Sequence, residues 1–263
     1  MLRQADAMEE VAVMKRKLKY RQIASKAMKH VVMWKHPYLR SCLPATAWYS
    51  EENIKKMMMQ FPTVFVKPDK GGGGSGIVRI RKLTHRFEVC FRKNCRMVEE
   101  RNLGRTVEKL LSPSRRYILQ EGVELATIKE RPFDIRVLLQ KPRDRWTLSG
   151  MVVKVAARGR FVTNHCKGGQ PMEMKKALHA MDGEGITPEK TIRELEKISY
   201  LTADVLERSF PGLKELGIDV GLDREGTPWI FEVNTRPFFR MFSKIGNPSV
   251  YRKILRNHQQ IIK

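Results

Sequence analysis

A glycine-rich loop between two short apolar stretches is the feature that most restricts the fold of this chain. Residues 63–67 read Thr-Val-Phe-Val-Lys and residues 77–81 read Ile-Val-Arg-Ile-Arg, and both alternations predict β-strands. Residues 71–76, Gly-Gly-Gly-Gly-Ser-Gly, join them in a loop whose bare backbone amides can approach an anion. A strand after the loop excludes a dinucleotide-binding turn, which needs a helix there, and the Gly-Lys-Ser/Thr ending of a P-loop is missing.

The same loop also matches the glycine pattern of protein kinases, from Gly71 to Val78, and that pattern does lie between strands. The chain lacks the catalytic-loop and Asp-Phe-Gly motifs that a kinase requires. Lys67 and Lys70 place positive charge at the mouth of the loop, which favours a cover over bound phosphate. A flexible hairpin loop without a ligand is the alternative.

A second predicted hairpin, near the carboxyl end, carries oxygen-bearing side chains. Glu232 and Asn234 are two residues apart on one strand and therefore point the same way. If the turn occupies residues 223–226, Asp219 pairs with Ile230 and joins that face, whereas an odd-length turn moves Asp219 to the other face. Three converging oxygen ligands suit Mg²⁺, and a surface hairpin with solvated carboxylates is the alternative.

The remaining pattern alternates helices and strands. Residues 2–36 contain no glycine or proline and predict one long helix, or two abutting helices, ending at Pro37. Near the join this segment presents three basic side chains expected to be solvated, Lys26, Lys29 and His30. Further helices are expected at residues 50–60, 103–111, 187–209 and 247–262. Strands are expected at residues 86–91, 95–99, 117–123, 133–140 and 146–155.

Charged residues interrupt two of these apolar strands. Asp134 and Arg136 share one face of the strand at residues 133–140. On the next strand Lys154 interrupts an apolar run, and a buried lysine is costly without an anion. We therefore expect an internal carboxylate or a bound phosphate beside Lys154. Residues 164–169, Asn-His-Cys-Lys-Gly-Gly, predict a small polar turn whose backbone amides can bind a ligand.

Charge is the outlying property of the composition, with 51 Lys+Arg against 28 Asp+Glu and a net charge of +23. Such an excess of positive charge attracts polyanions, which indicates a polyanionic partner. A generally basic, solvated surface without such a partner explains the charge equally well. The 263 residues, 41% hydrophobic, suffice for one large domain or two packed lobes, and no membrane span or signal peptide is recognised, which favours a soluble, cytoplasmic protein. Four cysteines without C-x-x-C spacing are expected to be reduced thiols rather than zinc ligands: Cys42, Cys90, Cys95 and Cys166.

The order of these motifs resembles the ATP-grasp superfamily and, within it, the endospore coat-associated YheC/YheD family. The resemblance spans about residues 25–255. It is carried by the glycine loop after Lys67, the Gln-Glu-x-Val sequence at residues 120–123, Pro-Phe-Asp-Ile-Arg at residues 132–136, Thr163-Asn164 with Gly168-Gly169, and Ile-Phe-Glu-Val-Asn at residues 230–234.

The resemblance implies an α+β, ATP-grasp fold in which two α+β lobes clasp ATP. The expected parts are an N-terminal helical segment (1–43), a small lobe with a glycine-rich lid (44–116) and a large lobe with a magnesium-binding hairpin (117–263). Relatives often carry a separate domain before the position of Lys26, and here only about 25 residues precede it, so no full pre-ATP-grasp domain is expected. The acceptor side is then open, completed by a partner or second subunit, or suited to a large substrate.

The resemblance also implies roles for individual residues. The expected ATP-binding residues are Lys26, Lys67, Gly73, Gly74, Ser75, Gln120, Glu121, Val123 and Asp134. Arg136, Lys154 and Asn164 are expected near the γ-phosphate and the acceptor, and Asp219, Glu232 and Asn234 are expected to carry Mg²⁺. Related ligases often have arginine at the position of Lys154, and lysine keeps the charge but loses the two-pronged hydrogen bonding.

The activity implied is that of an ATP-dependent carboxylate–amine ligase, which forms an amide through an acyl phosphate. Two alternatives stay open: a non-catalytic spore-coat or polyanion-binding protein that retains the fold, and an ATP-dependent phosphotransferase. The expected cofactors are ATP and Mg²⁺, and the expected partner is a small-molecule, peptide or acidic polymer substrate. Nucleic acid is less favoured, a membrane is not expected, and association with spores is compatible with the family.

Overall fold

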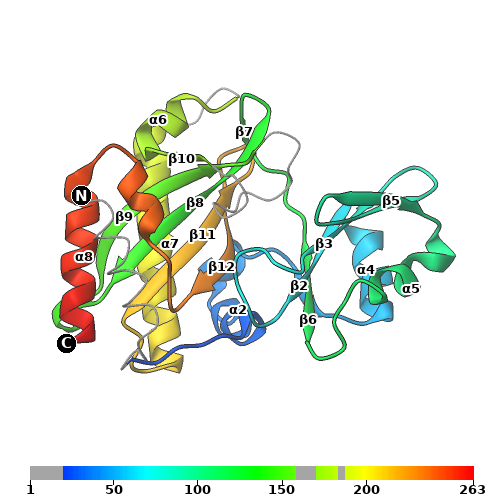
Figure 1. Cartoon of the computed structure of the whole chain (residues 1–263), viewed down its shortest axis with the longest axis horizontal. Helices are drawn as coiled ribbons and strands as arrows, with labels where there is room; N and C mark the ends of the chain where they lie inside the picture. Colours follow the sequence, from blue (N-terminus) through cyan, green and yellow to red (C-terminus); the bar gives the residue numbers. More distant parts are fainter. Residues whose placement is uncertain (1–19, 158–169, 183–186) are drawn as a thin grey trace.

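Two antiparallel sheets lie side by side in the computed structural model, which describes residues 20–157, 170–182 and 187–263 (Figure 1). The smaller sheet has the order β1-β6-β2-β3-β4-β5 and the larger has the order β10-β9-β8-β11-β12, with β7 paired to β8. The smaller sheet contains β1 (Thr46–Trp48), β2 (Thr63–Pro68), β3 (Val78–Lys82), β4 (Phe87–Phe91), β5 (Asn94–Val98) and β6 (Tyr117–Glu121). The larger contains β7 (Thr127–Ile128), β8 (Arg131–Gln140), β9 (Thr147–Val155), β10 (Gln170–Met172), β11 (Glu215–Leu222) and β12 (Pro228–Asn234).

Helices cover one face of the smaller sheet. Helix α4 (Glu51–Gln60) begins where the Ser50 hydroxyl accepts a hydrogen bond from the Asn53 amide, and it packs Ile54 onto the sheet. Helix α5 (Leu103–Glu108), preceded by the 3₁₀ turn η1 (Glu100–Asn102), packs beside it and ends three residues earlier than the sequence predicts. Alternating side chains of β2 and β3 fill the same core, so the opposite face of these strands is left for the glycine loop and its cleft.

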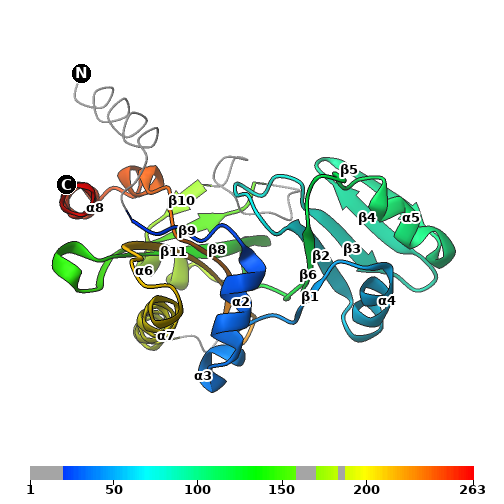
Figure 2. The ribbon, with the colours of Figure 1, turned by 90° about the horizontal axis from the view of Figure 1, so that it is seen from below.

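Both faces of the larger sheet are covered (Figure 2). On one side lie α2 (Lys26–Trp34), α3 (Pro37–Arg40), α6 (Met174–His179) and α7 (Pro188–Ser209). On the other side lie the 3₁₀ turn η4 (Arg240–Lys244) and α8 (Pro248–Ile262), which is capped by Asn247. A further 3₁₀ turn, η2 (Pro142–Asp144), joins β8 to β9. Because the sheet is buried on both faces, its strands are almost continuously apolar, and the few charged residues within them are conspicuous.

The prediction of a long N-terminal helix is wrong for the part of this segment that the structure describes. Residues 20–24 are not helical, and α2 begins only at Lys26, because the Ser25 hydroxyl accepts a hydrogen bond from the Met28 amide. As expected, the helix ends before Pro37, at Trp34, and Pro37 then begins the short helix α3, where its missing amide hydrogen costs nothing. Residues 1–19 lie outside the described part of the chain.

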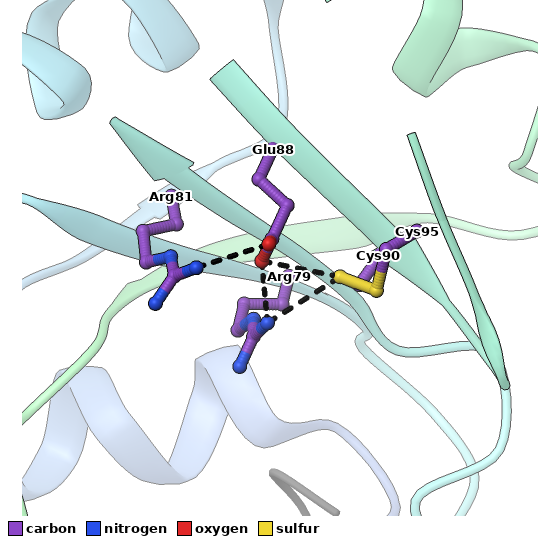
Figure 3. Close-up of a disulfide and its surroundings, with 5 residues drawn as sticks. All are labelled: Arg79, Arg81, Glu88, Cys90 and Cys95. Atoms are coloured by element: carbon purple, nitrogen blue, oxygen red, sulfur yellow. Dashed lines mark hydrogen bonds and ion pairs between the residues drawn. A yellow bond between two sulfur atoms is a disulfide. The ribbon is translucent and has the colours of Figure 1, made fainter. Parts of the chain in front are cut away.

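The expectation of reduced thiols is also wrong for two of the four cysteines. Cys90 on β4 and Cys95 on β5 form a disulfide because the hairpin places them directly opposite each other (Figure 3). The absence of C-x-x-C spacing therefore does not exclude a disulfide, since two paired strands bring together cysteines at other sequence separations. Cys42 is free and buried, and Cys166 lies outside the described residues.

Reducing the Cys90–Cys95 bond is expected to lower the free energy of unfolding by about 2 kcal/mol, because the cross-link closes only a short loop, with a sequence separation of 5. Urea unfolding followed by tryptophan fluorescence, with and without a phosphine reductant, measures the change. The matched control is Cys90→Ala/Cys95→Ala, whose midpoint should not respond to the reductant. A wild-type midpoint that is equally unresponsive would contradict the prediction.

None of the helices in the described ranges combines the length and the apolar character needed to cross a lipid bilayer.

Candidate active site

A cleft of about 540 Å³ opens between the two sheets. Its small-sheet side is formed by β2, β3 and the end of β6, together with the glycine loop. Its large-sheet side is formed by Asp134 on β8, Asp219 on β11, and Phe231 and Glu232 on β12. Most of the basic residues of the lining are therefore on the small-sheet side, and the large-sheet side contributes three carboxylates, those of Asp134, Asp219 and Glu232.

Helix α2 starts at the junction of the two sheets. The Asp69 carboxylate, just after β2, accepts hydrogen bonds from the Ser25 hydroxyl and the Ala27 amide, both at 2.9 Å. On the other side, the Ile23 amide donates to the hydroxyl of Thr235, just after β12, at 2.8 Å. The amino end of α2 is thus fixed to both sheets, and this places the side chain of Lys26 in the cleft.

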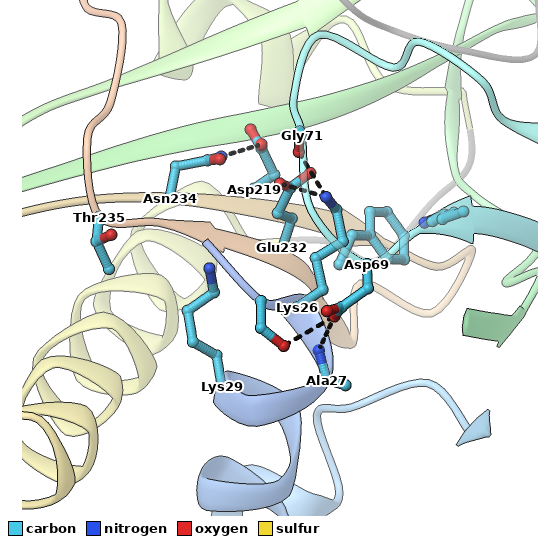
Figure 4. Close-up of polar contacts among 12 residues, drawn as sticks. Lys26, Ala27, Lys29, Asp69, Gly71, Asp219, Glu232, Asn234 and Thr235 are labelled. Atoms are coloured by element: carbon cyan, nitrogen blue, oxygen red, sulfur yellow. Dashed lines mark hydrogen bonds and ion pairs between the residues drawn. The ribbon is translucent and has the colours of Figure 1, made fainter. Parts of the chain in front are cut away.

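Two lysines meet at the base of the glycine loop. The Lys26 ammonium donates to the Gly71 carbonyl at 2.6 Å and lies 3.4 Å from the Glu232 carboxylate (Figure 4). The Lys67 ammonium donates to the Gln120 carboxamide oxygen and lies over the Phe231 ring. Burial lowers the pKa of Lys67 to about 8, and Lys26 adds to this effect while Glu232 opposes it. Among the described residues, neither Lys26 nor Lys67 has a carboxylate closer than the 3.4 Å between Lys26 and Glu232.

Asp219 lines the cleft and belongs to a buried charge network that extends behind it. Its Oδ1 accepts hydrogen bonds from Arg136 Nε at 2.9 Å and Lys154 Nζ at 2.7 Å, and its Oδ2 accepts from Arg136 Nη2 at 2.8 Å. Lys154, only 2% exposed, also lies 2.9 Å from Asp134 Oδ1. Burial alone raises the pKa of Asp219, but Arg136 and Lys154 outweigh it and hold that pKa well below its usual range. The internal carboxylate expected beside Lys154 is thus present.

The donor chemistry of the β12 face fits a hard cation. Glu232 lines the cleft, is partly exposed and has Lys26 as its ion-pair partner, so its carboxylate is accessible to a metal ion. Asn234 lies two residues further along the strand, and its amide donates to Asp219 Oδ2 at 3.3 Å. Mg²⁺ prefers such oxygen donors from one or two carboxylates. Both oxygens of Asp219 are already bonded to cations, so Glu232 is the readiest ligand of the three.

The predicted register of the hairpin is wrong, although the predicted convergence is found. Residues 223–227 form an odd-length turn, because the Asp223 carboxylate accepts hydrogen bonds from the amides of Glu225 and Thr227. Such a turn alone would put Asp219 on the other face. A β-bulge between Asp219 and Val220 restores the phase, so Asp219 pairs with Glu232 and not with Ile230.

Most of the predicted site residues line the cleft, namely Lys26, Lys67, Gly74, Ser75, Gln120, Glu121, Val123, Asp134, Asp219 and Glu232. Gly73 belongs to the loop without lining the cleft, and Arg136 and Lys154 contact Asp219 from below. Asn164 lies outside the described residues, so its predicted position stays a prediction.

Two features of the cleft and one buried lysine near it are missing from the sequence-based prediction. Phe65 and Phe231 form apolar walls, and Phe231 is the extra residue of the bulge, which no strand periodicity indicates. Arg79 and Arg81 on β3 also line the cleft, and their alternation with apolar residues was the available signal. Lys29, expected to be solvated, is only 4% exposed and donates to the Ile23 carbonyl at 2.7 Å; burial lowers its pKa to about 8.

The chain is similar to two curated proteins of Bacillus subtilis (strain 168). It is 26% identical over 223 residues to the endospore coat-associated protein YheD, covering 81% of this chain and 48% of that protein. It is 22% identical over 212 residues to the endospore coat-associated protein YheC, covering 77% of this chain and 56% of that protein. The chain thus spans about half the length of these curated relatives.

The fold is similar to that of two solved ligases. The ATP-grasp ligase PsnB, complexed with a phosphomimetic variant of its minimal precursor, Mg and ADP, matches with a TM-score of 0.50 and 15% identity, over 89% of this chain and 58% of that chain. D-alanyl-alanine synthetase A from Vibrio cholerae matches with a TM-score of 0.52 and 14% identity, over 90% of this chain and 64% of that chain. These similarities establish an α+β, ATP-grasp fold.

A family model described as "YheC/D like ATP-grasp" matches residues 16–261, nearly the whole chain. The expected relationship is therefore confirmed: this chain belongs to the YheC/D-like ATP-grasp family.

Proposed function

We propose that this chain is an ATP-dependent carboxylate–amine ligase. The observation that carries the proposal is the cleft itself, in which Lys26 and Lys67 face the carboxylate of Glu232 beneath a glycine loop. A nucleoside triphosphate needs cations for its phosphates, an apolar wall for its base and a metal ligand near its terminal phosphates. The residues that line this cleft offer groups suited to all three needs, and similarity to ligases of the same fold supports the proposal.

In this proposal the small-sheet side binds the nucleotide. Phe65 and Val123 form the wall for the base, and Lys26 and Lys67 lie where the phosphates enter beneath the loop. Gly74 and Ser75 line the cleft, and in this proposal the backbone of the glycine loop donates to phosphate oxygens. Closure of the loop would exclude water, which strengthens these electrostatic contacts.

The large-sheet side supplies the reacting end of the site. Glu232, with Asn234 and Asp219, would hold Mg²⁺, which offsets charge on the transferred phosphoryl group. Arg136 and Lys154 hold the Asp219 carboxylate in place and keep it ionised. A substrate carboxylate oxygen then attacks the γ-phosphorus with loss of ADP, and the resulting acyl phosphate reacts with an amine, releasing phosphate and a proton as the amide forms.

The decisive experiment measures ADP release with Mg²⁺-ATP and pools of amino acids and acidic peptides, with hydroxylamine added to capture an acyl phosphate. Hydroxamate formation is the expected result. ADP release without hydroxamate, together with a phosphorylated acceptor, would overturn the ligase in favour of a phosphotransferase. ATP binding without any turnover across the pools would favour a non-catalytic protein that retains the fold.

ATP binding is expected to take up a proton above about pH 8, because bound phosphate should raise the pKa of Lys67 from about 8. Below that pH the lysine is already protonated in the free protein, so affinity should be constant there and fall as pH rises through it. Calorimetric titrations in two buffers of different ionisation heat measure the uptake. Lys67→Met should abolish it.

Lys29→Met is the matched control for this titration. Lys29 has a similarly lowered pKa, yet it is bonded to the Ile23 carbonyl and does not line the cleft, so this variant should keep the proton uptake. Equal heats in the two buffers for the wild-type protein would contradict the prediction.

A further inference from the structure

A second concave surface lies at the far end of the smaller sheet. It is a groove of about 570 Å³ between β5 and α5, which we call the outer groove. Both ribbon views place β5 and α5 at the end of the molecule away from β8 and β9 (Figures 1 and 2). None of the residues that line the outer groove lines the nucleotide cleft. The lining residues are Arg86, Arg96, Met97, Val98, Glu99, Arg101, Asn102, Arg105, Thr106 and Lys109.

The outer groove has a large excess of positive charge. Four arginines and one lysine line it, against a single carboxylate, Glu99, which pairs with Arg101 at 2.8 Å. Within the described ranges, the exposed side chains of Arg86, Arg96, Arg105 and Lys109 have no carboxylate within ion-pair distance. Like charges gathered in one concave surface repel one another, so an anionic ligand would relieve that repulsion.

The arginine-rich lining indicates which anionic groups fit. A guanidinium group presents a planar fork of donors that matches a carboxylate in a two-pronged geometry. The lining contains no aromatic side chain, so it offers no stacking platform for the bases of a single-stranded nucleic acid. The chemistry of the lining therefore favours carboxylates on a flexible chain over nucleobases.

The backbone beside the groove favours a polypeptide. β5 is the outermost strand of the smaller sheet, with β4 as its neighbour, so the hydrogen-bonding groups on its outer side have no partner strand in the sheet. The Cys90–Cys95 disulfide ties β5 to β4 and holds this edge in place. An extended peptide can add to such an edge through its backbone while its side chains meet neighbouring pockets.

We propose that the outer groove docks an extended acidic polypeptide segment, whose carboxylates pair with Arg86, Arg96, Arg105 and Lys109 and whose backbone adds to the edge of β5. This site is separate from the nucleotide cleft and does not depend on the reaction proposed for it. An acidic substrate or partner could be held there while another part of it reaches the cleft.

The test is fluorescence anisotropy of a labelled oligoglutamate peptide titrated with the full chain in the absence of ATP, so its outcome is independent of the ligase assay. Arg96→Glu/Arg105→Glu is expected to weaken binding about tenfold or more, since two exposed ion pairs are replaced by repulsions. The matched control is Arg252→Glu/Arg256→Glu, which makes the same charge change on exposed residues of α8 and should bind almost like the wild-type protein.

Two further probes separate the possible ligands. A peptide of alternating glutamate and proline should bind more weakly than oligoglutamate of equal charge, because proline lacks the amide that pairs with a strand edge. Oligothymidylate should bind more weakly than oligoglutamate and without dependence on the groove variant. Equal losses in the two double variants, no preference against the proline-containing peptide, or stronger binding of oligothymidylate through Arg96 and Arg105 would each overturn the proposal.

Discussion

Replacing Lys154 with methionine is expected to lower the free energy of unfolding by about 3–5 kcal/mol at neutral pH. The ammonium lies between Asp134 Oδ1 at 2.9 Å and Asp219 Oδ1 at 2.7 Å, and the side chain is 2% exposed. Without it, two buried carboxylates face each other with Arg136 as the remaining cation of this network. Urea unfolding of both proteins measures the difference.

The difference should shrink as the pH falls. The folded-state pKa of Asp219 is depressed in the wild-type protein, so its stabilising contribution is present above the unfolded pKa, about 3.9, and is lost as pH falls through the folded value. The variant lacks much of that contribution, so the two proteins converge in acid. A loss that stays constant from neutral pH to acid would mean that Lys154 stabilises the fold by packing and not by charge.

Two comparisons isolate this charge effect. Lys190→Met changes an exposed lysine at the start of α7 and should alter stability by no more than about 0.5 kcal/mol. Combining Lys154→Met with Asp134→Asn should restore part of the loss, because it removes one of the two carboxylates left facing each other. Additive losses in that double variant would argue against a coupled network.

Replacing Glu232 with glutamine is expected to reduce ATP turnover about a hundredfold or more, while the melting temperature hardly changes. The two effects separate because Glu232 is partly exposed and its contact with Lys26, at 3.4 Å, is long for an ion pair. The substitution keeps the size of the side chain and removes the charge that the proposed metal site needs. ADP release, hydroxamate capture and thermal unfolding are measured on the same preparation.

Glu225→Gln is the matched control, since Glu225 is exposed in the turn of the same hairpin. This variant should retain wild-type turnover and stability. If Glu232→Gln released ADP at the wild-type rate, Glu232 would not be a metal ligand in the reaction, and the proposed arrangement of the site would fail.

Short sequence patterns were enough to predict individual strands, one loop and the starts of two helices. The glycine run between two alternating segments gave the loop between β2 and β3, and the caps at Ser50 and Asn247 gave the starts of α4 and α8. An apolar strand interrupted by Lys154 was enough to predict a buried anion, because an unpaired buried charge is so costly.

The features that the sequence did not predict depend on contacts between segments that are far apart in the chain. The bulge that restores Asp219 to the face of Glu232 leaves no trace in the strand periodicity, so the convergence was correct while the pairing was not. The burial of Lys29 depends on the Ile23 carbonyl and on the packing of α2 beside the larger sheet. Likewise, the engagement of both Asp219 oxygens by Arg136 and Lys154 follows from three neighbouring strands, β8, β9 and β11.

The shared anchoring of α2 has a mechanical consequence. Ser25, at its amino end, is bonded to Asp69 beside one sheet, and Ile23, just before it, is bonded to Thr235 beside the other, so this segment links the two sheets. Lys26 extends from that segment, and any change in the angle between the sheets must pull on it. The position of the Lys26 ammonium beside the glycine loop therefore depends on the angle between the two sheets.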